Sequence, residues 1–208
     1  MLENEENKKL QEDESQEDHK SARGKDLYEW VQALVCSVLA VVLVFTFLVR
    51  LIGVDGSSMV PTLQHQDRLL VLNSLWYDDY QYGDVVVLRK ESFMESPIVK
   101  RVIATEGQTV DIDFSTGSVY VDDVLLEEDY INELTFTEEG IQFPVTVPEG
   151  SIFVLGDNRN HSSDSRHADL GTADSRYVIG KAVFLLFPGA GEGVYTQKRD
   201  FGRIGLIG

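Results

Sequence analysis

Two adjacent serines, Ser57 and Ser58, lie in a short turn directly after the one long apolar run of the chain. Gly56 precedes them and can adopt a positive φ without strain, whereas Pro61 fixes its own φ and favours an extended residue before it. A backbone shaped in this way can hold a hydroxyl ready for nucleophilic attack. The same residue types also form turns with no chemistry, so a nucleophile here needs a base from elsewhere in the chain.

A candidate base is Lys100, which lies in the apolar run Ile98–Ile103 beside Arg101. Side chains alternate along a strand, so one of these two cations must share a face with Ile98 and Val102. Burial lowers the pKa of a lysine by up to about 3–5 units. Reaching neutrality corresponds to roughly 4 kcal/mol against the charged form. A lysine in that environment can accept a serine proton, whereas one that extends its amine into water is chemically inert.

A third candidate is the polar loop at residues 156–166, which directly follows an apolar strand. It supplies an acid–guanidinium pair, Asp164 with Arg166, together with amides and three hydroxyls, those of Ser162, Ser163 and Ser165. Such groups can orient a lysine amine by hydrogen bonding. A solvated turn and a calcium loop are the alternatives, although the spacing of the acids fits no EF-hand pattern.

A Ser-His-Asp triad competes with the serine and lysine pairing. His161 and His167 both belong to the polar loop, and His65 lies in a polar turn close after the serines. Neither loop histidine has flanking residues that would fix its tautomer, as a triad requires. The triad therefore stays open as a second interpretation.

The composition limits the partners. The chain has 208 residues, 43% of them hydrophobic, and a formal net charge of −17. The acidic balance argues against a surface that follows phosphates, so no nucleic acid partner is expected. Cys36 is the single cysteine, which excludes an intrachain disulfide and any cysteine-based zinc site.

The N-terminal region predicts a tail and a membrane anchor. Residues 1–25 are polar and charged, which predicts a disordered cytoplasmic tail. Residues 31–49 carry no charge and span about 28 Å as a helix, close to the thickness of a hydrocarbon core. We expect a single transmembrane signal anchor over 26–52, followed by an extracytoplasmic β-rich domain over 53–208. Lys20, Arg23 and Lys25 before the span favour a cytoplasmic N-terminus.

The rest of the chain has the pattern of short strands. Alternating or β-branched runs bounded by polar turns predict a mainly β, antiparallel and barrel-like fold. They cover 68–73, 84–89, 98–103, 110–114, 119–121, 143–147, 151–155 and 178–187. No amphipathic helix of ten or more residues is expected, and the acidic stretch 127–140 predicts an exposed loop.

Taken together, these stretches resemble the bacterial type I signal peptidases, which are membrane-anchored serine/lysine proteases. The order and spacing of the boxes make the resemblance specific, and it covers most of the chain after the tail. The boxes are Gly-x-Ser-Met-x-Pro-Thr at 56–62, Tyr-Gly-Asp-Val-Val at 82–86, Lys-Arg at 100–101, a segment near 121–128, Gly-Asp-Asn-Arg-x-x-Ser-x-Asp-Ser-Arg at 156–166, and Ile-Gly-Lys-Ala at 179–182.

The resemblance assigns roles to particular residues. It makes Ser58 the nucleophile, Lys100 the general base and Ser162 a hydrogen-bond partner of the lysine, and it makes Asp164 and Arg166 a structural ion pair. It implies a mainly antiparallel β fold and no metal or cofactor. Some members carry a serine or threonine hydroxyl for the oxyanion hole where this chain has Gly56. Here only backbone donors, such as the Ser58 N–H, come from this stretch.

The expected substrates are secretory preproteins, cleaved at the bilayer surface after small residues. A cleavage region bound as an extended strand places the residues one and three before the cut on the same side. The expected walls of the two shallow pockets are Val54, Met59, Leu63 and Val99, with core packing an equal interpretation for Leu63. The alternatives are a self-cleaving regulatory protease with the same pair and a non-catalytic membrane-tethered β module.

Overall fold

The structure is a computed structural model that describes residues 28–191 and 198–207, so the expected tail over 1–25 lies outside the described residues. The chain divides into two units, 1–46 and 47–208. The first contributes most of an apolar helix, Tyr28–Leu48, whose last turn is the π-helix η1 (Val44–Leu48). Among the described residues this is the one helix long and apolar enough to cross a membrane.

The helix is shorter than the predicted anchor. It ends at Leu48, and strand β1 (Val49–Gly53) follows at once and pairs with β2 (Arg68–Asn73). Residues 49–52 therefore belong to the sheet, although the sequence analysis placed them in the anchor. Composition alone does not separate the two, because Leu51 and Ile52 continue the apolar run into a strand.

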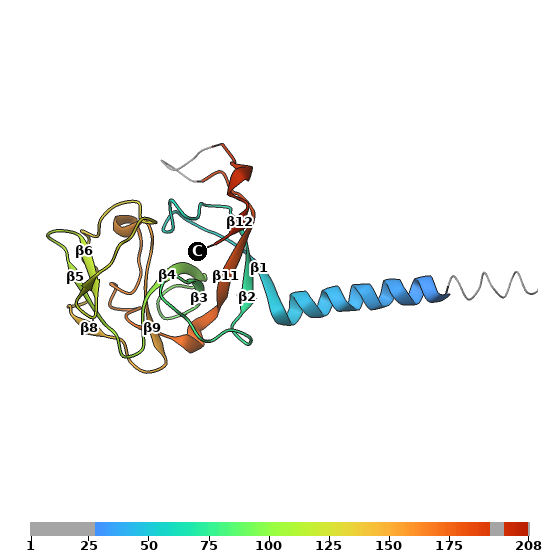
Figure 1. Ribbon diagram of the computed structural model, residues 1–208, viewed down its shortest axis with the longest axis horizontal. Coiled ribbons are helices and arrows are strands. Elements are labelled where there is room, and N and C mark those ends of the chain that lie inside the picture. The colour runs from blue at the N-terminus through green and yellow to red at the C-terminus, as the bar shows by residue number, and fades with distance from the viewer. Residues whose placement is uncertain (1–27, 192–197, 208) are drawn as a thin grey trace, which may run out of the picture. The chain divides into compact units, whose positions relative to one another are not determined.

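Antiparallel pairing builds the second unit (Figure 1). The larger sheet runs, in spatial order, through β1, β2, β11 (Val178–Phe187), β3 (Val85–Leu88), β4 (Ile98–Thr105), β9 (Ser151–Leu155) and β10 (Ala173–Asp174), and β12 (Gly205–Leu206) pairs with β11. The smaller sheet has the order β7 (Val124–Leu125), β6 (Ser118–Val121), β5 (Thr109–Asp113), β8 (Val145–Thr146). Single 3₁₀ turns occur at η2 (Arg159–His161), η3 (Ser175–Tyr177) and η5 (Phe201–Arg203).

The predicted fold class is confirmed as mainly β and antiparallel. The longer runs were located well: β2, β9 and β11 have the predicted bounds. The strands that the sequence analysis did not predict are β1, β7, β10 and β12. Three of these have two residues each, which is too short for any alternation to be visible.

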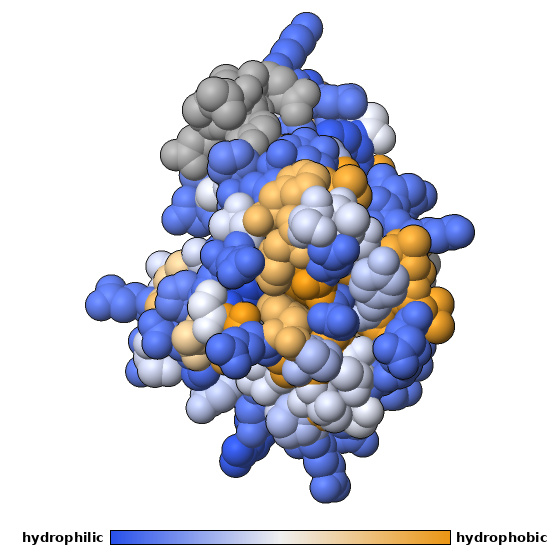
Figure 2. Space-filling model, turned by 90° about the vertical axis from the view of Figure 1, so that its left-hand side faces the viewer, coloured by the Kyte–Doolittle hydropathy of each residue, from blue (hydrophilic) through white to orange (hydrophobic). Residues whose placement is uncertain are grey.

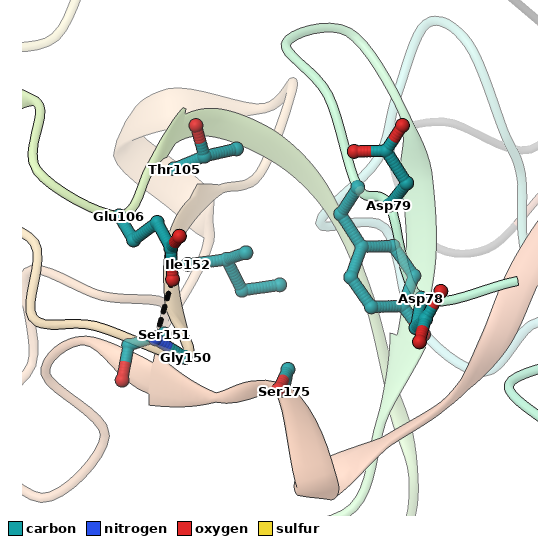
Figure 3. A pocket seen from close by; sticks show the side chains of 9 residues that line it. Asp78, Asp79, Thr105, Glu106, Gly150, Ser151, Ile152 and Ser175 are labelled. Atoms are coloured by element: carbon teal, nitrogen blue, oxygen red, sulfur yellow. Dashed lines mark hydrogen bonds between the residues drawn. The ribbon is translucent and has the colours of Figure 1, made fainter.

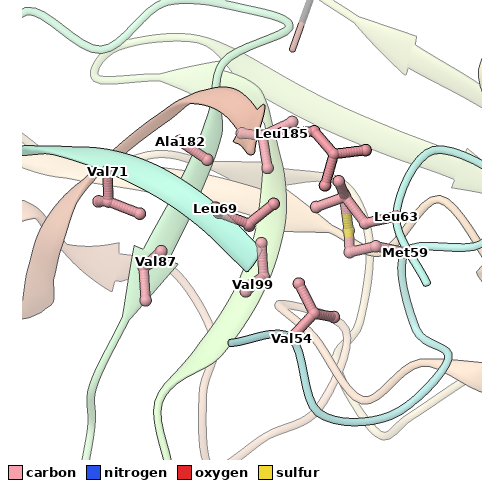
Figure 4. Close-up of a cluster of buried hydrophobic side chains, with 10 residues drawn as sticks. Val54, Met59, Leu63, Leu69, Val71, Val87, Val99, Ala182 and Leu185 are labelled. Atoms are coloured by element: carbon pink, nitrogen blue, oxygen red, sulfur yellow. The ribbon is translucent and has the colours of Figure 1, made fainter. Parts of the chain in front are cut away.

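Buried apolar side chains anchor the segment that carries the serines. One core cluster joins Val54, Met59 and Leu63 from that segment to side chains of β2, β3, β4 and β11 (Figure 4). Met59 and Leu63 each keep only 1% of their surface exposed. Core packing therefore holds the segment in place both before and after Ser58. The face of the molecule in Figure 2 is mostly hydrophilic around a central apolar patch, as the acidic composition predicts.

Candidate active site

The turn that carries Ser58 lies in the connection between β1 and β2. Gly56 has φ +89°, the conformation that its lack of a side chain was expected to permit. The turn is closed by Val60 N–H donating to Ser57 O at 3.1 Å and Leu63 N–H donating to Met59 O at 2.8 Å. Ser58 is half-buried, so its hydroxyl stays open to a cleft.

The structure brings Ser58 and Lys100 together. Lys100 lies on β4, keeps 2% of its surface exposed, and its Nζ is hydrogen bonded to Ser58 Oγ at 2.7 Å. A second bond runs from Lys100 Nζ to Val99 O at 3.1 Å. These lengths are those of ordinary hydrogen bonds. A serine oxygen and a lysine amine that are 42 positions apart in the chain are thus in contact for proton transfer.

The surroundings of Lys100 shift its titration toward neutral pH. Burial is the largest effect and lowers the pKa of Lys100 to about 8. The carboxylates of Asp164, Glu139 and Asp157 act in the opposite direction, and the Arg166 guanidinium lowers the pKa slightly further. At pH 7 about one-tenth of the amine is therefore uncharged, which suits a general base.

Asp164 of the polar loop interacts electrostatically with Lys100, which together with Ser58 forms the pair that we call the dyad. Asp164 receives bonds from Arg166 Nε at 2.8 Å and Nη2 at 2.9 Å, and both side chains are fully buried. Burial alone raises the pKa of Asp164, but the bonds and charge of Arg166 outweigh it and hold that pKa below its usual range. The ion pair expected beside the site is therefore present.

Ser162 makes a different contact from the one implied by the resemblance. Its hydroxyl donates to Asp164 Oδ2 at 2.9 Å, whereas the bonds of Lys100 Nζ go to Ser58 and Val99. A direct bond between Ser162 and Lys100 was expected. The hydroxyl proton of Ser162 goes to the Asp164 carboxylate, a charged acceptor that forms a strong hydrogen bond.

The sequence analysis missed a second buried ion pair on the other side of the Lys100 strand. Arg101 Nε and Nη2 each lie 2.9 Å from the carboxylate of Asp157, and both side chains keep 1% of their surface exposed. Thr62 also donates its hydroxyl to Asp157, and the Arg101 guanidinium stacks 4.1 Å from the ring centre of Tyr130. A second cation inside an apolar strand was the available signal, because a buried guanidinium requires a carboxylate.

A residue of the polar loop bonds directly to the serine turn. Asn158 donates its backbone N–H to Ser58 O at 3.0 Å and its side-chain amide to Ser57 O at 3.0 Å. The polar loop and the nucleophile turn are thus bonded backbone to backbone. This contact was not predicted either.

Gly156 is required where the polar loop meets the turn. A Cβ at this position would lie 2.1 Å from Ser162 Oγ and 2.6 Å from Ser58 O, so the turn would have to move. We expect Gly156→Ala to lower kcat/KM by about 100-fold, the typical effect of a displacement of about 1 Å in an active site. Steady-state kinetics test this, with Gly205→Ala as the control, because a Cβ at Gly205 meets open space. Unchanged kinetics of Gly156→Ala would contradict the contact.

The triad interpretation is not supported. Ser58 Oγ is bonded to Lys100, and His65 Nδ1 accepts the Gly56 N–H at 3.1 Å. His161 is exposed and has its Nε2 3.9 Å from Glu133. The calcium interpretation is disfavoured as well, because arginines already pair Asp157 and Asp164. Within 28–191 and 198–207, no group of three or more His, Cys, Asp or Glu side chains is placed to hold a metal ion.

A cleft of about 250 Å³ opens over the dyad. Its lining comes from the serine turn, the segment before and into β4, and the polar loop: Asp55, Gly56, Ser57, Ser58, Met94, Ser96, Pro97, Ile98, Val99, Lys100, His161 and Ser163. Of the four expected pocket walls, Val99 lines this cleft and also packs in the core. Val54, Met59 and Leu63 pack in the core beneath it (Figure 4).

A different cavity, of about 270 Å³, lies where β4 ends and β9 begins (Figure 3). Asp78, Asp79 and Glu106 contribute carboxylates to its lining, and Glu106 accepts a bond from Gly150 N–H. Ser58 and Lys100 do not line it. Ser58 and Lys100 therefore line the smaller cleft and not this cavity.

A serine oxygen and a buried lysine amine are in contact on a curled antiparallel β fold. The comparisons with known proteins identify the family. Residues 27–187 match the family model described as signal peptidase, peptidase S26. The chain therefore belongs to the S26 signal peptidase family.

Relatives in several bacteria support this assignment. Signal peptidase I of Bacillus licheniformis is 34% identical over 180 residues, which is 83% of this chain and 95% of that protein. Signal peptidase I T of Bacillus subtilis is 35% identical and a probable signal peptidase I-1 of Synechocystis 38% identical, covering 77% and 74% of this chain and 85% and 79% of those proteins. A crystal structure of an Enterococcus faecalis signal peptidase I is 33% identical and covers 50% of this chain and 96% of that chain, with a TM-score of 0.41.

Proposed function

We propose that the protein is a membrane-anchored endopeptidase that removes N-terminal signal peptides from exported preproteins, with Ser58 as nucleophile and Lys100 as general base. The observation that supports this most directly is the 2.7 Å bond between Ser58 Oγ and the Nζ of a lysine that is 2% exposed. The family assignment points to the same substrates.

The reaction follows from these two groups. Neutral Lys100 takes the Ser58 hydroxyl proton while Ser58 Oγ attacks the carbonyl carbon before the cut. The resulting oxyanion is stabilised by the Ser58 N–H, since Gly56 supplies no hydroxyl. The C–N bond breaks, the leaving amine takes the proton from Lys100, and an acyl-enzyme remains. Lys100 Nζ then takes a proton from a water molecule, whose oxygen attacks the acyl carbon and breaks the C–Oγ bond of the ester. Lys100 gives this proton to Ser58 Oγ, which restores both groups.

The cleft provides a reason for small residues at the cut. We place the cleavage region as an extended strand between the serine turn and the chain that enters β4. Val99 then forms a wall beside the residues one and three before the cut. Val54, Met59 and Leu63 support that wall from the core, which leaves only shallow pockets.

The helix Tyr28–Leu48 suits a membrane anchor in length and composition. We assign residues 1–25 to the cytoplasm and the β unit to the opposite side, because basic residues precede the helix. The lipid bilayer is then a second partner, and preproteins reach Ser58 at its surface.

Incubating the full chain in detergent micelles with a preprotein tests the proposal. A precursor with alanine one and three residues before the cut should be cleaved at that single bond. Replacing either alanine by leucine should lower kcat/KM by about 100-fold, because a shallow pocket has no room for the side chain. Mass spectrometry of the products locates the cut.

Two results would favour the alternatives. Cleavage of the chain itself, with the precursor left intact, would indicate a self-cleaving regulatory protease. An intact precursor and an intact chain at every pH tested would indicate a non-catalytic β module.

A further inference from the structure

The C-terminal segment, residues 198–207, lies beyond the part of the chain that matches the family model. It is attached to the sheet through β12, where Gly205 pairs with Leu185 and Leu206 with Phe184 of β11. Ile207 N–H donates to Val183 O at 3.2 Å. The segment therefore has a defined position, and Arg203 lies just before its strand.

Arg203 binds a buried carboxylate of the loop that carries the nucleophile. Its Nη1 lies 3.1 Å from Asp67 Oδ1 and its Nη2 lies 2.7 Å from Asp67 Oδ2, so the pair is bidentate. Asp67 is fully buried and also accepts the N–H groups of Gln64 at 2.8 Å and Gly189 at 2.6 Å. A carboxylate in this setting is stable only while its donors stay in place.

Asp67 closes the loop at whose other side Ser58 lies. Val54 N–H donates to Asp67 O and Gln66 N–H donates to Val54 O, both at 2.9 Å. These two bonds join the ends of residues 54–67, which we name the nucleophile loop. A shift of Asp67 therefore moves the base of the turn that presents Ser58.

Arg203 also reaches the middle of the nucleophile loop. Its Nη2 donates to Thr62 O at 3.1 Å, and the Thr62 hydroxyl in turn donates to Asp157. Asp157 is the partner of Arg101, which follows Lys100 on β4. The C-terminal segment and the lysine strand thus hold Thr62 from two sides, which fixes the distance between nucleophile and base.

Gly189 lies directly against the same loop. A Cβ there would lie 2.0 Å from His65 O and 2.8 Å from Asp67 N, which leaves no room for any side chain. His65 accepts a hydrogen bond from the Gly56 N–H, so a displacement of His65 would also move the turn before Ser58. The chain after β11 therefore contacts the nucleophile loop at two separate places.

From these contacts we propose that the C-terminal segment sets the catalytic position of Ser58, with Arg203 and Asp67 as positioning residues. The inference rests on the proposed function and deepens it. It assigns a role in catalysis to a part of the chain outside the family match.

Arg203→Ala and Arg203→Lys in the full chain test this, with Arg199→Ala as the matched control. Arg199 belongs to the same segment but stacks on Phe187 at 5.2 Å instead of bonding the loop. We expect kcat for a signal-peptide substrate to fall about 100-fold in Arg203→Ala, with KM within about threefold of wild type. In Arg203→Lys we expect kcat to fall about tenfold, because a single ammonium group replaces the bidentate guanidinium. Arg199→Ala should match wild type.

Thermal unfolding separates positioning from stability. A lower Tm with kcat per folded molecule unchanged in Arg203→Ala would overturn the inference, and if that variant does not fold, a wild-type kcat in Arg203→Lys would do the same. Ser58→Ala, assayed in parallel, isolates the proposed function. Processing by Ser58→Ala overturns both ideas, whereas an inactive Ser58→Ala beside a fully active Arg203→Ala overturns the positioning role alone.

Discussion

Replacing Ser58 by alanine should lower kcat for preprotein processing by about 10⁴-fold or more, because the acyl-enzyme can no longer form. The fold should survive, since Met59 and Leu63 still anchor the turn in the core. Cleavage of a labelled precursor, followed by electrophoresis, measures the loss, and circular dichroism checks that the variant is folded.

Ser57→Ala is the matched control. Ser57 is the neighbouring residue in the same turn and lines the same cleft, but the hydroxyl bonded to Lys100 Nζ at 2.7 Å is that of Ser58. The Ser57 contacts to Asn158 and Val60 use its backbone carbonyl, which the substitution keeps. Activity of Ser57→Ala should stay within about threefold of wild type, the small effect expected when no transition-state contact is lost. Loss of processing activity in Ser57→Ala together with full activity in Ser58→Ala would show that Ser57, and not Ser58, is the nucleophile.

The dyad illustrates what the sequence could predict. The resemblance to the signal peptidases selected Ser58 and Lys100, whereas the apolar neighbours of Lys100 left both a buried and a water-exposed amine open. The pairs that hold these two residues were not predictable in the same way. Arg101 and Asp157 are 56 positions apart in the chain, and Arg203 and Asp67 are 136 positions apart. No local sequence pattern indicates which acid pairs with which arginine.

The apolar residues around the serines show a second limit. Val54 and Met59 were predicted to line pockets, and Leu63 either to line a pocket or to pack in the core. All three pack in the core next to the cleft. Core and pocket walls are both apolar, so residue type does not distinguish them. Only the curvature of the sheet decides which side faces outward. The two-residue strands β7, β10 and β12 were missed for a related reason, because their pairing is set by their neighbours.

The pH dependence of processing should follow the amine of Lys100. Burial lowers its pKa to about 8, so the fraction of neutral amine rises about tenfold per pH unit below that value. We expect kcat/KM to increase with this slope from pH 5.5 to 7.5 and to level off above pH 8.5. Lys100→Met removes the base and should abolish processing at every pH. A wild-type profile that is flat from pH 6 to 9 would contradict the role of Lys100.

The same shift predicts an unusual effect on stability. An unfolded chain protonates Lys100 with an ordinary pKa of 10.5, whereas the folded protein does so only near 8. Between these values the unfolded state binds more protons, so the lysine opposes folding fully below pH 8 and ceases to do so above about pH 10.5. Lys100→Met should therefore be more stable than wild type at pH 7, by at most about 3 kcal/mol.

Urea unfolding of both proteins at pH 7 and at pH 10.5 measures this difference, which should shrink as pH rises. Lys181→Met is the control, because Lys181 pairs with Asp84 at 2.6 Å and its pKa is raised although partial burial alone lowers it. That lysine stabilises the fold at neutral pH, and the contribution is lost only as pH rises through its folded pKa. Its replacement should destabilise. An inactive, more stable Lys100 variant beside a less stable Lys181 variant would identify Lys100 as a buried amine kept for chemistry at a cost in stability.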